Sequence, residues 1–250
     1  MNCFNTGIAV KCLRRWWSER YASVMRMPSL LLSCAVFAVS LSGHAETLDQ
    51  LEHNAVRGDS SARIALADKY YYGEGVPKDL IKAAEWYRKA AQPKADRRAV
   101  YAFPGDANAQ FRLGCMYQNG DGVPKSSPEA VEWWKKAADQ GNMQAQYFLG
   151  YAYQAGEGVE KNDTKAVEWY QKAAAQGNAA SQRILASLYA TGTGVPKDIV
   201  FAYAWLNIAA ASGDPGHVAQ RNEFEKQLTA EQKAKAEKLA VDFFARMPKK

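Results

Sequence analysis

Apolar residues recur along the chain with a helical period that glycine interrupts at regular intervals. In four places a leucine is followed four residues later by a tyrosine, and residues four apart lie on one face of a helix. The pairs are Leu66/Tyr70, Leu113/Tyr117, Leu149/Tyr153 and Leu185/Tyr189. A Gly-x-Gly follows each pair, and glycine can adopt the left-handed conformation that ends a helix. The pattern predicts four helices, each ending at a glycine turn.

A second helical segment follows each glycine turn. It contains a tryptophan eleven residues after the second glycine and then an alanine pair. The tryptophans are Trp86, Trp133, Trp169 and Trp205, and the expected N-cap residues are Asp79, Ser126 or Ser127, Asp163 and Asp198. Each tryptophan shares a face with the alanine four residues later, so we expect the ring to pack against a small side chain and let helices approach closely.

The helix pairs form a repeat. The second glycines of the last three units are 36 residues apart, whereas those of the first two are 47 apart, which places an insertion at about residues 92–103. A single helix pair cannot bury its apolar faces, but stacked pairs can. The sequence therefore predicts an all-α solenoid of stacked helix-turn-helix repeats, with four repeats over residues 58–213.

Both ends of the stack need a cap. We expect an N-terminal capping helix at residues 46–57, which ends in Gly58-Asp59, and C-terminal capping helices at residues 214–250. In the C-terminal region Thr229 and Gln232 have the spacing of a capping box. Apolar residues recur along one stripe of the helix that this box would open.

The N-terminal region has the pattern of a signal peptide. An apolar run of 12 residues, Leu30 to Leu41, follows the basic Arg26 and precedes the small residues Gly43 and Ala45. The run is too short to span a bilayer. We predict a signal peptide at residues 1–45 with cleavage after Ala45, and no transmembrane segment after cleavage.

Two readings of the extreme N-terminus stay open. One places the true start at Met25 or Met27, and the other gives the signal peptide an unusually long polar region before its apolar run. Either reading predicts a periplasmic or secreted protein of a Gram-negative envelope.

Removal of the predicted signal peptide changes the charge of the chain. The whole chain has 32 basic and 26 acidic residues, and residues 46–250 have 27 and 25. This near-neutral balance gives no support for nucleic-acid binding. Cys115 is the only cysteine after residue 45, so no internal disulfide can form there.

The repeated residues resemble the Sel-one-like repeat, a relative of the tetratricopeptide repeat. The third unit, Ala145 to Ala174, carries the pattern nearly throughout, including Leu149, Gly150, Tyr153 and Trp169. The resemblance implies right-handed stacking and a concave surface lined by the first helices. It also implies an adaptor or scaffold role in protein complexes, and exported bacterial members resemble envelope regulators and assembly factors.

The stripe of the first helices opposite the Leu/Tyr pairs is the candidate partner-binding groove. It comprises Ile64, Asp68, Tyr71, Phe111, Cys115, Gln118, Tyr147, Tyr151, Gln154, Arg183, Ser187 and Ala190. Aromatic residues at intervals along such a face suit an extended or helical peptide of an unidentified envelope protein. The alternative is that Ile64, Phe111 and Tyr147 pack against the adjacent helix.

The sequence contains no recognisable catalytic site. Only His53 and His217 follow residue 45, at opposite ends, and no nucleotide, hydrolase or metalloprotease motif is present. We therefore predict no catalytic residues, no metal and no cofactor. Two alternatives are a β-lactam-binding or hydrolysing enzyme and a cell-wall glycan-binding module. The first resembles cysteine-rich members of the family, which carry paired cysteines where this chain has only Cys115.

Overall fold

A computed structural model describes residues 47–92, 104–211 and 213–246 of the chain. The predicted signal peptide and its possible start residues lie outside these ranges, as does nearly all of the insertion. The helices of the described residues are α3 (Leu48–Val56), α4 (Ser60–Tyr72), α5 (Leu80–Ala91), α6 (Ala107–Asn119), α7 (Ser127–Asp139), α8 (Met143–Ala155), α9 (Asp163–Ala175), α10 (Ala179–Thr191), α11 (Ile199–Ala210), α12 (Pro215–Glu225) and α13 (Ala230–Arg246).

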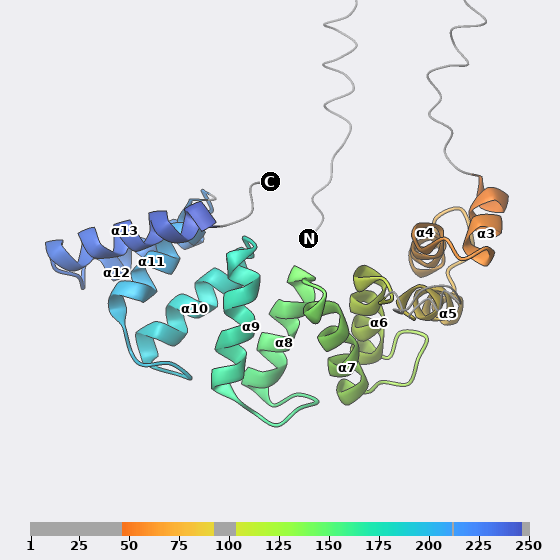
Figure 1. Cartoon of the computed structure of the whole chain (residues 1–250), viewed down its shortest axis with the longest axis horizontal. Helices are drawn as coiled ribbons and strands as arrows, with labels where there is room; N and C mark the ends of the chain where they lie inside the picture. The colour runs from red at the N-terminus through yellow and green to blue at the C-terminus, as the bar shows by residue number, and fades with distance from the viewer. Residues whose placement is uncertain (1–46, 93–103, 212, 247–250) are drawn as a thin grey trace, which may run out of the picture. The chain divides into compact units, whose positions relative to one another are not determined.

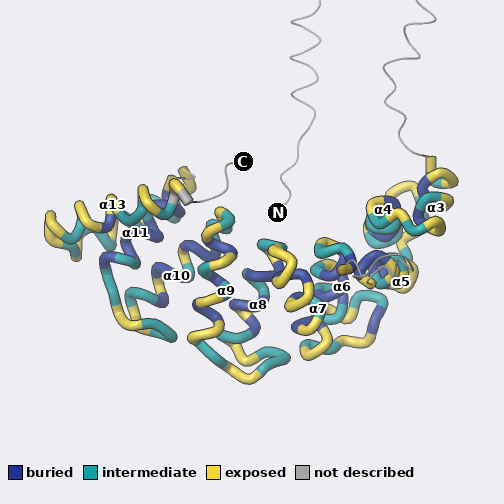
Figure 2. The backbone as a smooth tube through the Cα atoms, in the orientation of Figure 1, coloured by how far each residue is buried: buried dark blue, intermediate teal, exposed yellow. Residues whose placement is uncertain are grey.

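The helices pack as pairs, and the pairs stack. The four pairs are α4 with α5, α6 with α7, α8 with α9, and α10 with α11, and each second helix also packs against the first helix of the next pair. Figure 1 shows these helices following one another in chain order, and Figure 2 shows buried residues where neighbouring helices face each other. No strand occurs in the described part of the chain. The predicted all-α solenoid is confirmed.

The first helices have matching caps at both ends. Each begins after an Asp or Asn whose side chain accepts backbone N–H groups: Asp59, Asp106, Asn142 and Asn178. Each ends at a glycine in the left-handed conformation, as predicted: Gly73, Gly120, Gly156 and Gly192. These caps fix the length of each first helix and therefore the positions of its side chains.

The second glycine of the turn has an additional role between units. A Cβ atom on Gly158 would lie 2.4 Å from the carbonyl oxygen of Ser127, at the start of the preceding unit's second helix. Gly75 has nearly the same φ, +77° against +75°, but a Cβ atom there would meet nothing within 4 Å. Only α3 precedes the first helix pair in the described chain. The close contact at Gly158 therefore belongs to the stacking of one unit on the next.

The predicted N-caps of the second helices are correct in three units. Asp79, Ser126 and Asp198 accept backbone N–H groups from the first turns of α5, α7 and α11. The prediction of Asp163 in the third unit was wrong, because the side chain of Asn162 caps α9. Asn162 occupies the position that corresponds to the other three caps, and Asp163 lies within the first turn.

The ring that packs most closely between the paired helices belongs to the residue after the predicted tryptophan. Tyr87, Trp134 and Tyr170 are almost fully buried. A Cβ atom on Gly150 would lie 2.7 Å from the Tyr170 ring, so glycine in the first helix makes room for this ring. Trp86, Trp133 and Trp169 are half-buried, and the Nζ atoms of Lys89, Lys136 and Lys172 lie 4.0, 4.1 and 3.8 Å from the respective ring centroids.

A polar side chain near the start of each first helix joins that unit to the helix before it. These side chains donate to backbone carbonyls near the end of the preceding helix: Arg63 to Ala55, Gln110 to Ala91, Gln146 to Ala138, and Gln182 to Ala174, over 2.9–3.2 Å. The last carbonyls of a helix have no partner within it. The carbonyls of Ala55, Ala138 and Ala174 also accept a backbone N–H from the turn that follows, so the side-chain bonds add a second donor there. They also satisfy the three buried glutamine side chains.

Helices α12 and α13 complete the described stack. Thr229 and Gln232 exchange hydrogen bonds of 2.9 and 3.2 Å, which confirms the capping box at the start of α13. The Phe243 ring stacks on Trp205 at a centroid distance of 4.9 Å. Ile208 stands where the first three units have a lysine beside the tryptophan. No described helix combines the length and apolar character needed to cross a bilayer.

Candidate functional site

The candidate site is the side of the first helices that faces away from the Leu/Tyr pairs. We call it the first-helix face and define it as Ile64, Asp68, Tyr71, Tyr72, Phe111, Arg112, Cys115, Gln118, Tyr147, Phe148, Tyr151, Gln154, Arg183, Ser187 and Ala190. It contains every predicted groove residue and three further residues, Tyr72, Arg112 and Phe148. All fifteen lie on α4, α6, α8 or α10.

Hydrogen bonds connect the first-helix face between the first and second units. The Tyr71 hydroxyl donates to Oδ2 of Asp121 over 3.0 Å, and Nη1 of Arg112 donates to the Tyr72 hydroxyl over 3.2 Å. The Tyr71 and Tyr72 rings contact each other edge to face, with centroids 5.0 Å apart. Tyr71, a predicted groove residue, therefore contacts Tyr72 and Asp121, and neither of these two was predicted.

Asp68 is held by a buried tyrosine. The Tyr87 hydroxyl of α5 donates a hydrogen bond to Oδ1 of Asp68. Burial raises the pKa of Tyr87, and the hydrogen bond to the Asp68 carboxylate raises it further. Asp68 thus links the two helices of the first unit and still lies partly at the surface.

An aromatic cluster connects the second and third units. The Phe148 ring lies 5.6 Å from Phe111, 5.4 Å from Tyr147 and 5.1 Å from Trp134, measured between ring centroids. Tyr147 also lies 6.0 Å from the buried Tyr170. Phe111 and Tyr147 are half-buried by these contacts, so both side chains contribute to packing while keeping part of their surface exposed.

Packing within the stack also involves three more predicted groove residues, namely Ile64, Gln118 and Gln154. Ile64 is half-buried against the core that the first and second units share. Nε2 of Gln118 donates to Oε1 of Glu157 in the next turn over 2.5 Å, and Oε1 of Gln154 accepts from the Tyr170 hydroxyl over 2.9 Å. These residues lie on the predicted face and also hold the stack together.

Five residues of the first-helix face are exposed, and four of them, all but the small Ser187, have long side chains. Tyr72 is 52% exposed and Tyr151 is 47% exposed, the only tyrosines among the exposed large apolar residues of the described chain. Arg112 and Arg183 are also exposed. These residues come from all four units, because Tyr72, Arg112, Tyr151 and Arg183 lie on α4, α6, α8 and α10 in turn.

Cys115 lies within this face and is half-buried against the core of the second and third units. Burial raises the pKa of its thiol, although the nearby Trp134 indole and the charge of Arg112 act in the opposite direction. The protonated thiol is therefore favoured, and a protonated thiol is a poor nucleophile.

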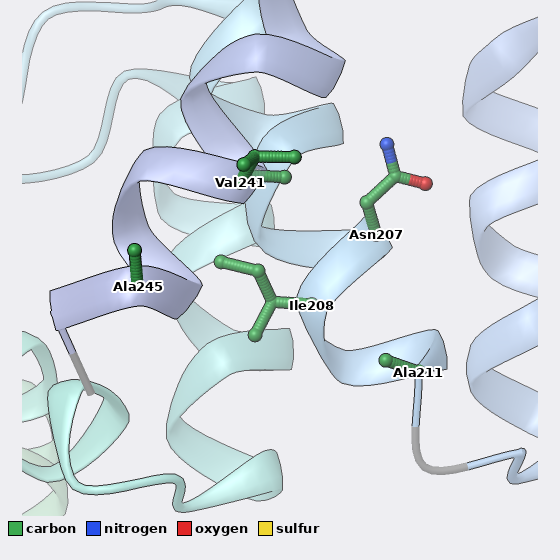
Figure 3. A pocket seen from close by; sticks show the side chains of 6 residues that line it. Asn207, Ile208, Ala211, Val241 and Ala245 are labelled. Carbon is green, nitrogen blue, oxygen red and sulfur yellow. The ribbon is translucent and has the colours of Figure 1, made fainter. Parts of the chain in front are cut away.

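Two pockets lie elsewhere in the described chain. One, of about 320 Å³, lies between α11 and α13 and is lined by Asn207, Ile208, Ala211, Ala240, Val241 and Ala245 (Figure 3). None of these six side chains can act as an acid or base. The other, of about 370 Å³, lies beside Trp133, Lys136, Asp139 and Gln140. Neither pocket is lined by a residue of the first-helix face.

The unpredicted residues of the face share a helical register. Arg112 and Phe148 directly follow the predicted Phe111 and Tyr147, and Tyr72 follows Tyr71. Predictions based on the spacing i, i+4 and i+7 select a narrow stripe, whereas the exposed side of these helices also includes i+1 and i+8. The wider stripe would have identified all three residues.

Comparisons with known proteins identify the repeat. The model of the Sel1 repeat matches four segments, residues 60–92, 107–142, 144–178 and 179–214. No match was found among curated proteins.

Two solved structures show the same fold at appreciable identity. The protective antigen c5321 of uropathogenic Escherichia coli, described as having an SLR fold, is 36% identical with a TM-score of 0.68, over 85% of this chain and 44% of that chain. This chain therefore spans less than half of the antigen. A Sel1 repeat protein from Oxalobacter formigenes is 31% identical with a TM-score of 0.60, over 72% of this chain and 71% of that chain.

Sel1 repeat proteins are generally protein-interaction scaffolds, and scaffold proteins of this type are typically non-enzymatic. The four matched segments coincide with the four helix pairs of the structure. The chain belongs to the Sel1 repeat family.

Proposed function

We propose that the protein is an exported interaction scaffold that binds a partner protein or peptide through the first-helix face. The observation that carries the proposal is the series of exposed side chains, Tyr72, Arg112, Tyr151 and Arg183, with one residue from each successive unit. Tyrosine and arginine are enriched at protein interfaces, where both combine a large contact area with hydrogen-bonding groups.

The arrangement of the face supports the recognition of a continuous segment. Arg112 contacts Tyr72 across the first junction, and Phe111 contacts Phe148 across the second, so the face continues between units. A partner lying along the stack would contact several units at once. Its affinity would come from many moderate contacts on a surface that the stacking holds in place.

The proposed location rests on the N-terminal sequence pattern. Export would place the scaffold in the periplasm or outside the cell. Fractionation of the native host, followed by N-terminal sequencing, tests this location. A mature protein that begins at Glu46 in the periplasmic or extracellular fraction is the expected result, and a chain retained in the cytoplasm with residues 1–45 intact would contradict it.

A capture experiment with cross-linking in the host envelope tests the face. Tyr72→Ala/Tyr151→Ala removes two exposed rings, and Ile81→Ala/Val241→Ala is a matched control, because Ile81 and Val241 are 63% and 67% exposed and lie on α5 and α13. We expect a partner that wild type and control both capture and the tyrosine variant does not. Equal capture by all three proteins would move the contact off the first-helix face.

Tyr147 is less suitable than Tyr72 for this experiment. Its ring lies 5.4 Å from Phe148 and 6.0 Å from Tyr170, so truncation would also disturb the packing between α8 and α9. Loss of capture in a Tyr147 variant would therefore combine two effects, whereas Tyr72 and Tyr151 are more exposed, and the contacts of Tyr72 with Tyr71 and Arg112 lie on the face itself.

A further inference from the structure

We infer that the segment bound by the first-helix face is an acidic peptide whose Asp or Glu carboxylates pair with Arg112 and Arg183. This inference rests on the proposed function and adds the chemical class of the partner. It follows from a difference in hydrogen bonding. The arginines of the face have donors without a carboxylate partner, whereas the carboxylates on and beside the face already accept hydrogen bonds.

Arg112 offers a partly oriented guanidinium. It is exposed on α6, and its Nη1 donates to the Tyr72 hydroxyl over 3.2 Å. It forms no salt bridge with a carboxylate among the described residues, although the charge of Asp68 acts on it from a distance. A guanidinium has five N–H donors in a fixed plane, so most of its donors stay available to a carboxylate.

Arg183 presents a second guanidinium two units further along. It is exposed on α10, at the position that corresponds to Tyr147 in the preceding unit. Its side chain has no hydrogen bond or ion pair within the described ranges.

The carboxylates on and beside the first-helix face already accept hydrogen bonds within the stack. Asp68 accepts from Tyr87, and Asp121 accepts from Tyr71 and Asn119. Glu157 accepts from Gln118. A basic partner would have to compete with these bonds, three of which reach between helices or units, whereas an acidic partner would meet donors that have no carboxylate.

The position of Tyr151 adds a further feature to the expected partner. Arg112 lies in the second unit and Arg183 in the fourth, and Tyr151 is exposed in the third unit between them. The tyrosine ring can contact an apolar or aromatic residue of the peptide. The expected segment is therefore acidic at two places with an apolar residue between them.

Selection from a displayed library of random peptides tests this chemistry. The baits are the mature wild type, Arg112→Gln/Arg183→Gln, Tyr72→Ala/Tyr151→Ala, and the control Lys135→Gln/Lys235→Gln, which removes two exposed charges from α7 and α13. Circular dichroism establishes that all four are folded. The peptides selected by the wild type are then synthesised, and their affinities for the four proteins are measured at low and high salt.

We expect the wild type and the lysine control to select peptides rich in Asp and Glu. The arginine variant should bind these peptides about tenfold more weakly, and the difference should shrink as salt rises. Selected peptides without an acidic excess that still require Tyr72 and Tyr151 would overturn the acidic partner and leave the proposed face intact.

Two other results would have different consequences. Acidic peptides that bind all four proteins equally would contradict both the acidic partner and the first-helix face as the binding site. An absence of selected peptides would overturn the acidic-peptide inference, and the capture experiment in the host envelope would then decide the proposed function separately.

Discussion

The glycine turns and the first-helix face differ in how closely the four units resemble one another. At the turns, Gly73, Gly120, Gly156 and Gly192 share one left-handed conformation with φ between 73° and 82°. On the face, corresponding positions hold Ile64, Phe111, Tyr147 and Arg183. The turns repeat because backbone geometry and the approach of adjacent units restrict them. The face lacks these restrictions, so it can differ from unit to unit and carry the properties particular to this protein.

The largest expected effect comes from a pair of glycine substitutions that separates two causes of this repetition. Gly158→Ala combines an unfavourable φ with a Cβ atom 2.4 Å from the Ser127 carbonyl oxygen. Gly75→Ala has nearly the same φ without that contact. We expect a loss of about 3 kcal/mol or more in unfolding free energy for Gly158→Ala and about 1 kcal/mol for Gly75→Ala.

Thermal and urea denaturation of the two variants check this difference. Because repeat proteins can unfold in parts, the shift of each midpoint is compared together with the width of the transition. Equal shifts for Gly75→Ala and Gly158→Ala would show that the left-handed conformation alone accounts for the second glycine.

We call the buried sides of the helices, which hold the Leu/Tyr pairs and the rings of Tyr87 and Tyr170, the frame. Alkaline pH should weaken the packing of this frame. Burial raises the pKa of Tyr87 and Tyr170 above the ordinary value of 10. The unfolded chain therefore loses these protons first as pH rises, so the stabilisation is complete below pH 10 and decreases above it. The loss approaches about 1.4 kcal/mol per pH unit for each tyrosine.

Urea midpoints measured from about pH 8 upward test this dependence. They should stay level up to about pH 9 and then fall, together with the appearance of tyrosinate absorbance on unfolding. Tyr170→Phe should reduce the slope. A midpoint that stays constant through pH 11 would contradict the burial of these hydroxyl groups.

A smaller effect is expected where the frame meets the face. Tyr87→Phe removes the hydrogen bond to Asp68, and Tyr170→Phe removes the one to Gln154. We expect losses of about 1 to 2 kcal/mol for the first and about 1 kcal/mol for the second, because a carboxylate makes the stronger hydrogen bond. Denaturation at neutral pH ranks the two variants, and the opposite order would show that Asp68 finds enough solvent to replace Tyr87.

The smallest effect on stability is expected on the first-helix face itself. Tyr151→Ala and Arg183→Gln each remove an exposed side chain, and we expect changes in unfolding free energy within about 0.5 kcal/mol. Denaturation midpoints measure the change, with Tyr153→Ala as a control from the Leu/Tyr frame of the same helix. A large loss for Tyr151→Ala would place this side chain in the core and remove the contrast between frame and face.

The sequence was sufficient to predict the elements that local chemistry determines. Gly156 and the N-cap Asp198 were identified because helix ends require particular residue types. The burial of Tyr170 instead of Trp169 could not be predicted in this way, since both rings lie on the apolar side of the helix. Its burial depends on the space left by Gly150 on the paired helix. Arg112 was missed because the stripe chosen from the sequence left out position i+1, and its contact with Tyr72 joins two units, which no pattern within one helix shows.

Site-specific photo-cross-linking in the host tests the central claim most directly. A photo-reactive amino acid is placed either at Tyr151 on α8 or at Lys135 on α7, both exposed positions in neighbouring helices. The account predicts a covalent adduct with a partner from position 151 and none from position 135. An adduct from position 135 with none from position 151 would contradict binding through the first-helix face.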